Sequence, residues 1–181
     1  TEIAEEDTLQ KSSVLGMDIL VNINIAPTVK MGVNLSVDGK NRIDLQGGGE
    51  LAYTMNTLGD SRFTGRYNLT GGFVRYNPPI ISEKLFKIQD GSYVSWNGDI
   101  ADPQMSITAV ETVRTTISEE EKNTRQVNFD ISIIIKNSLE NLSVSFDLSA
   151  PEDLTLQNQL TSLTAEQRAS QAMSLLIYNT Y

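Results

Sequence analysis

The sequence predicts a mainly β protein that ends in one short helix. Three observations carry this prediction: apolar and polar residues alternate strictly in several segments, turn-forming residues separate those segments, and helical spacing of apolar residues occurs only near the C-terminus. Successive side chains of a strand point to opposite sides, so this alternation is typical of strands that bury one face. Because the connections are short, we expect the strands to run antiparallel.

The first half of the chain predicts strands that are separated by proline and glycine. Pro27 is expected to end the first strand, and an Asp-Gly pair at 38–39 predicts a hairpin turn after the second. Three glycines at 47–49 predict a bulge or a sharp bend. The segment 71–76 is expected to form a strand separate from the one that ends near Leu69. One apolar face of this half is expected to contain Ile19, Val21, Ile23, Ile25, Val33, Leu35, Ile43 and Leu45.

The second half repeats the alternation and then changes to a helical pattern. Its expected apolar face contains Phe129, Ile131, Ile133, Ile135, Val144, Phe146 and Leu148. Thr164 and Gln167 have the spacing of a capping box, and apolar residues follow at intervals of three and four. The sequence therefore predicts one helix, which packs on the sheet through small residues.

Strands that are apolar on one side must hide a continuous apolar face, and three arrangements do so. Two sheets can form a sandwich, one sheet can close as a barrel, or one long sheet can fold over itself as a trough. The pattern alone favours a packed sandwich core and does not separate it from an open trough. An unfilled apolar trough requires an occupant or a partner.

Composition excludes several classes of function. The 181 residues suffice for one domain, which we expect at 14–181, after a polar lead-in at 1–13. A net charge of −9 with scattered Lys and Arg disfavours nucleic-acid binding. The chain has no His and no Cys, which removes the usual general base and the commonest metal ligands. We therefore expect no enzyme, no metal and no cofactor.

The remaining candidate sites have ordinary structural interpretations. Asp99 and Asp102 could be a carboxylate pair, but acidic residues in turns explain them more simply. The three glycines lack the Lys and Ser/Thr of a phosphate-binding loop. Trp96 could stack on a ligand, yet cross-strand aromatic packing is the commoner role. No catalytic constellation survives this comparison.

One segment resembles a known family. The stretch FKIQDGSYVSWNGDIADPQMSITA, 86–109, resembles the motif of the C-terminal domain of the TamB family, the inner-membrane-anchored component of the translocation and assembly module. The chain, with its closing segment LTAEQRASQAMSLLIYNTY, resembles most the Bacteroidetes branch. The motif positions, which the resemblance interprets as structural, are Phe86, Gly91, Trp96, Gly98, Asp99 and Pro103.

The resemblance implies a fold and a function. The fold would be a long antiparallel sheet folded into a taco-like trough with an apolar interior. The parent protein would be anchored in the inner membrane of a Gram-negative bacterium and span the periplasm, similar to bridge-like lipid-transfer proteins. It would carry phospholipid acyl chains between the membranes, and the fifteen apolar residues named above would line the trough. A charge at Ile133 would then block lipid occupancy while the fold is retained.

The resemblance also leaves a second function open. The domain could be a chaperone or docking module for the assembly or secretion of outer-membrane proteins. It would pair its sheet edges with nascent outer-membrane strands, or meet an outer-membrane barrel of the Omp85 type by β-augmentation. The terminal residues 174–181 would be the expected contact for that barrel.

Overall fold

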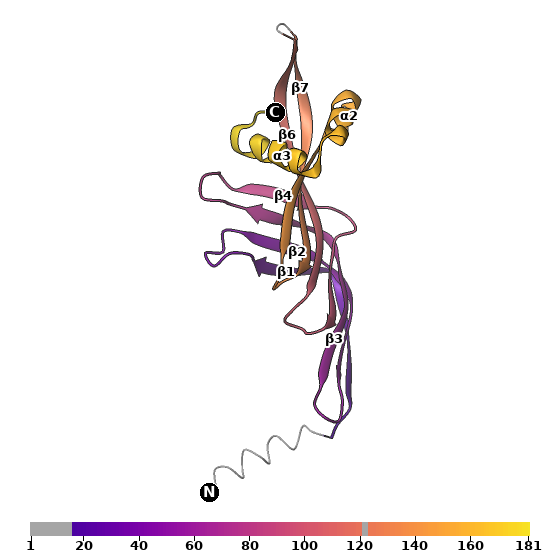
Figure 1. Ribbon diagram of the computed structural model, residues 1–181. Coiled ribbons are helices and arrows are strands. Elements are labelled where there is room, and N and C mark those ends of the chain that lie inside the picture. Colours follow the sequence, from indigo (N-terminus) through magenta and orange to yellow (C-terminus); the bar gives the residue numbers. More distant parts are fainter. Residues whose placement is uncertain (1–15, 121–122) are drawn as a thin grey trace.

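The computed structural model describes residues 16–120 and 123–181, so the polar lead-in predicted at 1–13 lies outside the described residues. These described residues form eight strands and then two helices (Figure 1). The strands are β1 (Ile19–Asn34), β2 (Arg42–Met55), β3 (Ser61–Tyr76), β4 (Lys84–Ile88), β5 (Tyr93–Gly98), β6 (Gln104–Glu120), β7 (Asn123–Ser138) and β8 (Ser143–Ser149). The helices are α2 (Leu154–Ser162) and α3 (Ala165–Tyr178).

All eight strands belong to one antiparallel sheet, which confirms the predicted fold class. Its order is β1-β2-β3-β4-β6-β7-β8, and β5 pairs with β3 and β6. β4 and β5 pair with successive parts of β3, at 73–76 and 63–68, so together they fill one strand position. Every strand thus lies next to its neighbours in the chain, as short connections require.

Two predicted strand ends, at Pro27 and near Leu69, lie inside strands instead. Pro27 is within β1, at a register shift between Ile25 and Val29. The three glycines are within β2, where the register shifts between Gln46 and Gly47, and 71–76 continues β3. A proline is tolerated at a bulge of an edge strand, because it removes no bond that the sheet needs there. The predicted bulge or bend at 47–49 is confirmed.

Gly48 shows why glycine is required at this bend. A Cβ atom at Gly48 would lie 2.8 Å from the carbonyl carbon of Ala26 and 2.8 Å from the nitrogen of Pro27. Both atoms belong to the backbone of β1, so no side chain could move aside. β1 and β2 approach this closely where the sheet turns, and Figure 1 shows both strands changing direction along their length.

The C-terminal helix α3 is confirmed, and the structure adds a second helix before it. Thr164 Oγ1 accepts a hydrogen bond from the Gln167 backbone nitrogen at 3.2 Å, and Gln167 Oε1 accepts one from the Thr164 nitrogen at 2.9 Å. α2 begins after Asp153, whose carboxylate accepts a bond from the Leu156 nitrogen at 3.0 Å. α2 buries only Leu156 and Leu160, so its apolar pattern is too sparse to predict a helix.

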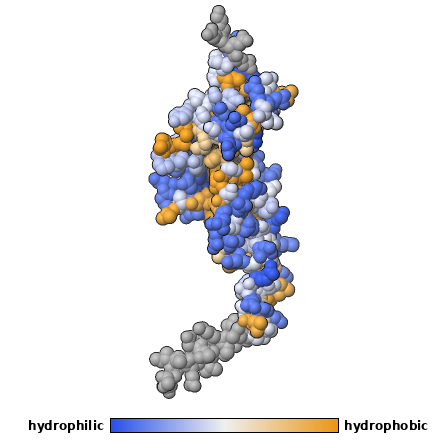
Figure 2. All heavy atoms as spheres, viewed as in Figure 1, coloured by the Kyte–Doolittle hydropathy of each residue, from blue (hydrophilic) through white to orange (hydrophobic). Residues whose placement is uncertain are grey.

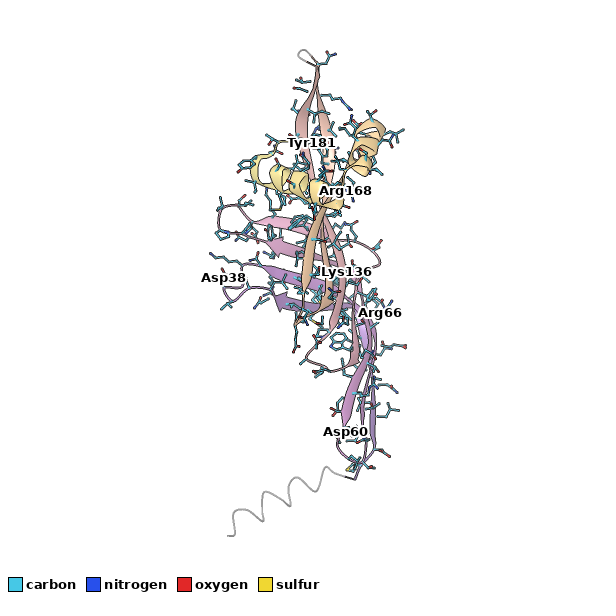
Figure 3. All side chains as sticks on the ribbon, in the orientation of Figure 1. Asp38, Asp60, Arg66, Lys136, Arg168 and Tyr181 are labelled. Atoms are coloured by element: carbon cyan, nitrogen blue, oxygen red, sulfur yellow. The ribbon has the colours of Figure 1, made fainter. Side chains whose placement is uncertain are left out.

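Arg168 fixes α3 against its surroundings. Its Nε donates to Asp147 Oδ1 of β8 at 2.7 Å, and its Nη1 donates to the Leu163 carbonyl oxygen, next to α2, at 2.7 Å. Figure 3 shows Arg168 at the start of α3, close to the sheet. One side chain therefore joins the two helices to the last strand.

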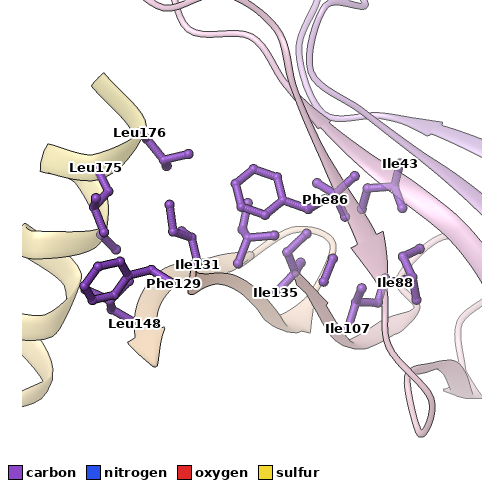
Figure 4. Close-up of a cluster of buried hydrophobic side chains, with 14 of the residues drawn as sticks. Ile43, Phe86, Ile88, Ile107, Phe129, Ile131, Ile135, Leu148, Leu175 and Leu176 are labelled. Atoms are coloured by element: carbon purple, nitrogen blue, oxygen red, sulfur yellow. The ribbon is translucent and has the colours of Figure 1, made fainter. Parts of the chain in front are cut away.

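The sheet folds over so that strands far apart in its order touch. Phe146 of β8 lies with its ring centroid 5.5 Å from that of Tyr76 in β3 and 6.4 Å from that of Phe86 in β4. Leu175 and Leu176 of α3 cover the same apolar cluster from the other side (Figure 4). The centre of the fold is therefore packed.

β4 and β6 pair over a short distance only. Their pairing ends at Lys87 with Val110, and beyond it β6 is paired with β7 alone among the described strands. In Figure 1 the ends of β1–β4 project to one side, while β6 and β7 continue past them toward the helices. The sheet thus forks between β4 and β6.

Candidate functional site: the apolar face of the sheet

Cross-strand register places the apolar residues of all strands on one face. Residues directly opposite each other in antiparallel strands point to the same side. One row of such partners crosses the whole sheet: Met31, Leu45, Gly72, Ile88, Ala109, Ile133 and Phe146. Neither register shift breaks this face. β1 and β2 keep their phase across the shifts, whereas in β3 the extra residue Thr70 changes the phase from Gly72 to Leu69, and both of these residues pair with β2 residues of the face. We call this surface the apolar face.

The structure brings the predicted lining residues onto this face but covers many of them. Those buried in the central cluster are Ile43, Leu45, Phe129, Ile131, Ile133, Ile135 and Leu148. Those partly buried are Ile19, Ile25, Val33, Leu35 and Phe146. Opposing strands and α3 fill the space above the first group, so only part of the face is open.

The open part lies along the edge strand β1. Val21 is 43% exposed and Ile23 is 37% exposed, and Val144 of β8 is also exposed, at the other edge. Val29 and Met31 continue the open strip along β1, although the predicted lining did not include them. Met31 has the same parity as Val33, so the signal was present in the alternation. Figure 2 shows apolar side chains gathered in a band across the middle of the face that it draws.

Glu111 is a charged residue on the apolar face that the predicted site did not include. Its register partner is Ile131, and it continues the parity of Ile107 and Ala109. Its Oε2 atom is buried and has no hydrogen-bond partner within the described residues. Burial raises the pKa of Glu111, and the positive charge of Lys84 opposes that increase. Burial at this position therefore disfavours the ionised form of the Glu111 carboxyl group.

The motif residues shape the turns around β4 and β5. Phe86 is fully buried, and Gly91 adopts φ +87° in the turn between the two strands, a conformation that favours glycine. The Trp96 ring meets Phe63 edge-on at 5.4 Å, and its Nε1 donates to the Ile100 carbonyl oxygen at 3.1 Å.

The two acidic residues of this segment stabilise turns. Asp99 Oδ1, next to Gly98 at the end of β5, accepts a bond from the Ala101 nitrogen at 2.8 Å. Asp102 Oδ1 accepts one from the Glu140 nitrogen at 3.4 Å, and the Pro103 carbonyl oxygen accepts one from the Leu139 nitrogen at 3.1 Å. These bonds tie the turn after β5 to the turn between β7 and β8. Across 16–120 and 123–181, no group of three or more acidic side chains could hold a metal ion.

Together these features define the class: a domain built on one open antiparallel sheet that is apolar on one face and covered by helices at one end. The chain belongs to the TamB family, because residues 2–180 match the TamB C-terminal domain. This match confirms the resemblance that the motif indicated. No curated protein and no solved structure matches the chain.

The TamB family is linked to the translocation and assembly module and to outer-membrane assembly, and it is not a known enzyme family. Its domains belong to the periplasmic extension of an inner-membrane-anchored protein and are associated in general with an Omp85-type partner. In the part of the chain that the structure describes, neither helix has the length and apolar character to cross a membrane.

Proposed function

We propose that this domain shields the acyl chains of phospholipids on its apolar face, within a periplasmic path between the inner and outer membranes that supports outer-membrane biogenesis. The observation that supports the proposal is the open apolar strip of β1, which continues the buried apolar face to the edge of the sheet. Val21, Ile23, Val29 and Met31 are each 37–43% exposed there. Such a strip is energetically costly in water unless something covers it.

An acyl chain fits the chemistry of this strip. Each CH₂ group removed from water contributes about 0.8 kcal/mol, and the contact needs no directed hydrogen bond. A lipid can therefore lie along β1 with its headgroup in solvent. Because no single contact is specific, the lipid can also move along the strand.

The proposal assigns different roles to the predicted lining residues. The side chains open to solvent along β1 contact the lipid directly. Residues buried under α3, such as Ile131 and Ile133, hold the sheet in shape beneath it. Ile133 is 2% exposed, so a carboxylate there would be buried without a partner and would unfold the domain. A charge at Ile133 is therefore unsuited to test lipid binding.

Ile23→Asp and Leu20→Asp form a matched pair for that test. Both residues lie on β1, and both are exposed, but Leu20 points to the opposite face. Each purified variant is incubated with phosphatidylethanolamine–phosphatidylglycerol vesicles, and bound lipid is measured by native mass spectrometry after re-isolation. We expect the wild type and Leu20→Asp to retain phospholipid and Ile23→Asp to lose most of it. Equal lipid on both variants, or a wild type without lipid, would contradict the proposal.

A second candidate function is docking to an outer-membrane partner. We propose that an Omp85-type barrel or an extended strand of a nascent outer-membrane protein binds this domain. Only part of the terminal segment 174–181 is available as a contact for the barrel, because Leu175 and Leu176 are buried in the core. The Tyr181 ring also stacks on Phe129 at 4.7 Å. Ile177, Tyr178 and Tyr181 are the exposed large apolar residues of this segment, and since Tyr181 already stacks on Phe129, Ile177 and Tyr178 are the side chains most available to a barrel.

A further inference from the structure

The edge of β6 above the fork carries a row of backbone groups that no other described residue pairs with. Thr108 establishes their direction, because its carbonyl oxygen accepts a bond from the Gln89 nitrogen at 2.8 Å and its nitrogen donates to Ser92 Oγ at 3.1 Å. Both groups of Thr108 therefore face the side of β4 and β5. The β6–β7 register runs without a shift from Gln104 to Ser118.

Backbone direction repeats every two residues in an antiparallel strand. The groups that face the same side beyond the fork belong to Thr112, Arg114, Thr116 and Ser118. Neither a strand nor a side chain among the described residues pairs with them. Six residue steps of about 3.3 Å make this free edge about 20 Å long.

A pocket lies over the β6–β7 hairpin beside this edge, and its lining includes Arg125 and Gln126 of β7. Its volume is about 880 Å³, and it lies between β6, the start of α2 and the terminal residues Asn179, Thr180 and Tyr181. Hydroxyl and amide side chains form much of the wall, including those of Thr116, Gln126 and Gln159. Thr115 Oγ1 donates to the Asn179 carbonyl oxygen at 2.8 Å and thereby holds the wall formed by the C-terminal residues. A polar pocket beside unpaired backbone groups suits a peptide better than an acyl chain.

The other free edges are poorer templates for a strand. β1 is interrupted by Pro27 and its bulge, and β8 has only seven residues. Both features are known ways to prevent pairing with another chain. β7 pairs with β8 only at 130–136, and the rest of its outer edge lies beside the start of α2, because Arg125 and Asn128 bind Asp153 and Glu152. The edge from 112 to 118 contains neither proline nor glycine, and most of its residues are β-branched. It is therefore the free edge best suited to accept a strand.

Charge indicates what kind of strand would bind. Arg114 is exposed on this edge, and no acidic partner is found for it within the described residues. The chain as a whole has a net charge of −9, so a local cation is the feature that would attract an acidic side chain.

We infer that the free edge of β6 from 112 to 118 is a docking site for an extended polypeptide segment that places an acidic side chain beside Arg114. The inference rests on the docking function proposed above and gives it a location, and it is independent of the lipid proposal. The segment would add a strand to β6 through main-chain hydrogen bonds, as in β-augmentation.

The probe is an eight-residue peptide, acetylated and amidated, that alternates valine with threonine and aspartate. Binding is followed by amide chemical shifts of the isotope-labelled chain. Thr116→Pro removes one edge-facing N–H and leaves the β6–β7 ladder intact, because that N–H points away from β7. Thr116→Ala is the control that keeps the N–H. A version of the peptide with lysine in place of aspartate tests the charge.

We expect the peptide to perturb amides of 112–118 and to bind Thr116→Pro at least about fivefold more weakly than Thr116→Ala. We also expect the lysine peptide to bind more weakly than the aspartate peptide. Equal affinities for the two variants, or for the two peptides, would overturn the inference. Perturbations at β1 or β8 instead would overturn it while leaving docking as a function, and an absence of binding to any edge would count against both. Thermal melts confirm that both variants fold.

Discussion

The backbone of β1 lies so close to Gly48 that only glycine fits at this position. A methyl group there would collide with the backbone of Ala26 and Pro27, whereas a methyl group at Gly71 would meet nothing closer than Gln46 Oε1 at 3.9 Å. We expect Gly48→Ala to lower the free energy of unfolding by about 2–3 kcal/mol, because backbone must shift to admit the methyl group. Gly71→Ala is the matched control and should change it little. Urea unfolding measures both, and equal effects would contradict this explanation of the bend.

The partly buried carboxyl group of Glu111 predicts that the stability of the domain depends on pH. Burial raises its folded-state pKa above the ordinary value of 4.5. Such a carboxyl group binds its proton more tightly in the folded state, so its contribution to stability is present at low pH and is lost as the pH rises through the folded-state pKa. Glutamine has no carboxyl group to ionise, so the Glu111→Gln variant does not lose this stability as the pH rises. We expect the variant to melt a few degrees above the wild type at pH 7.

The difference between Glu111→Gln and the wild type should shrink as the pH falls, and it should vanish below the ordinary pKa of a glutamate. Melting temperatures measured by circular dichroism from pH 4 to pH 8 test this. Glu140→Gln, at an exposed turn position, is the control for loss of one negative charge. A difference that does not change with pH would show that the ionisation of Glu111 has no part in it.

At the scale of elements, α3 acts as a cover for the apolar face. Leu175 is 2% exposed and packs into the central cluster, while Ile177 two residues later is 40% exposed. We expect Leu175→Ala to cost about 2–4 kcal/mol of unfolding free energy, since the removed atoms leave a cavity. Ile177→Ala should cost less than about 1 kcal/mol. Chemical denaturation compares the two, and similar costs would mean that α3 is not docked as described.

At the scale of the whole molecule, the two halves of the sheet differ in how they are covered. β7 has neighbours on both sides from Asp130 to Lys136, and its residues Ile131 and Ile135 are fully buried there. β1 has a neighbour on one side only among the described strands, and its apolar side chains are open. Stability is therefore expected to be lowest along β1.

Hydrogen exchange tests this difference. Amides of β7 should exchange only through global unfolding, while amides of the first half of β1 should exchange through local opening at least about tenfold faster. The measurement is made on the chain without lipid and again after incubation with phospholipid vesicles. Selective protection of β1 by lipid would support the proposed lipid face, and uniform exchange rates along the sheet would contradict the expected difference.

The alternation of residues determined much of this protein without the structure. It predicted a mainly β fold, antiparallel neighbours, the shared face of residues such as Ile23 and Ile133, and the helix that begins after Thr164. These features are local, because the side to which a side chain points depends only on its place in the strand. The motif around Trp96 in turn identified the family.

The tertiary structure decided which of these apolar residues are covered. Sequence did not indicate that Ile133 is buried while Ile23 is open, that Glu111 lies on the apolar face with an Oε2 atom that no described residue pairs with, or that Pro27 lies within a strand. Each of these depends on contacts between segments far apart in the chain, such as Phe146 with Tyr76 and Leu175 with the central cluster. Periodicity determines the face of the sheet on which a residue lies, whereas only folding determines what lies against that face.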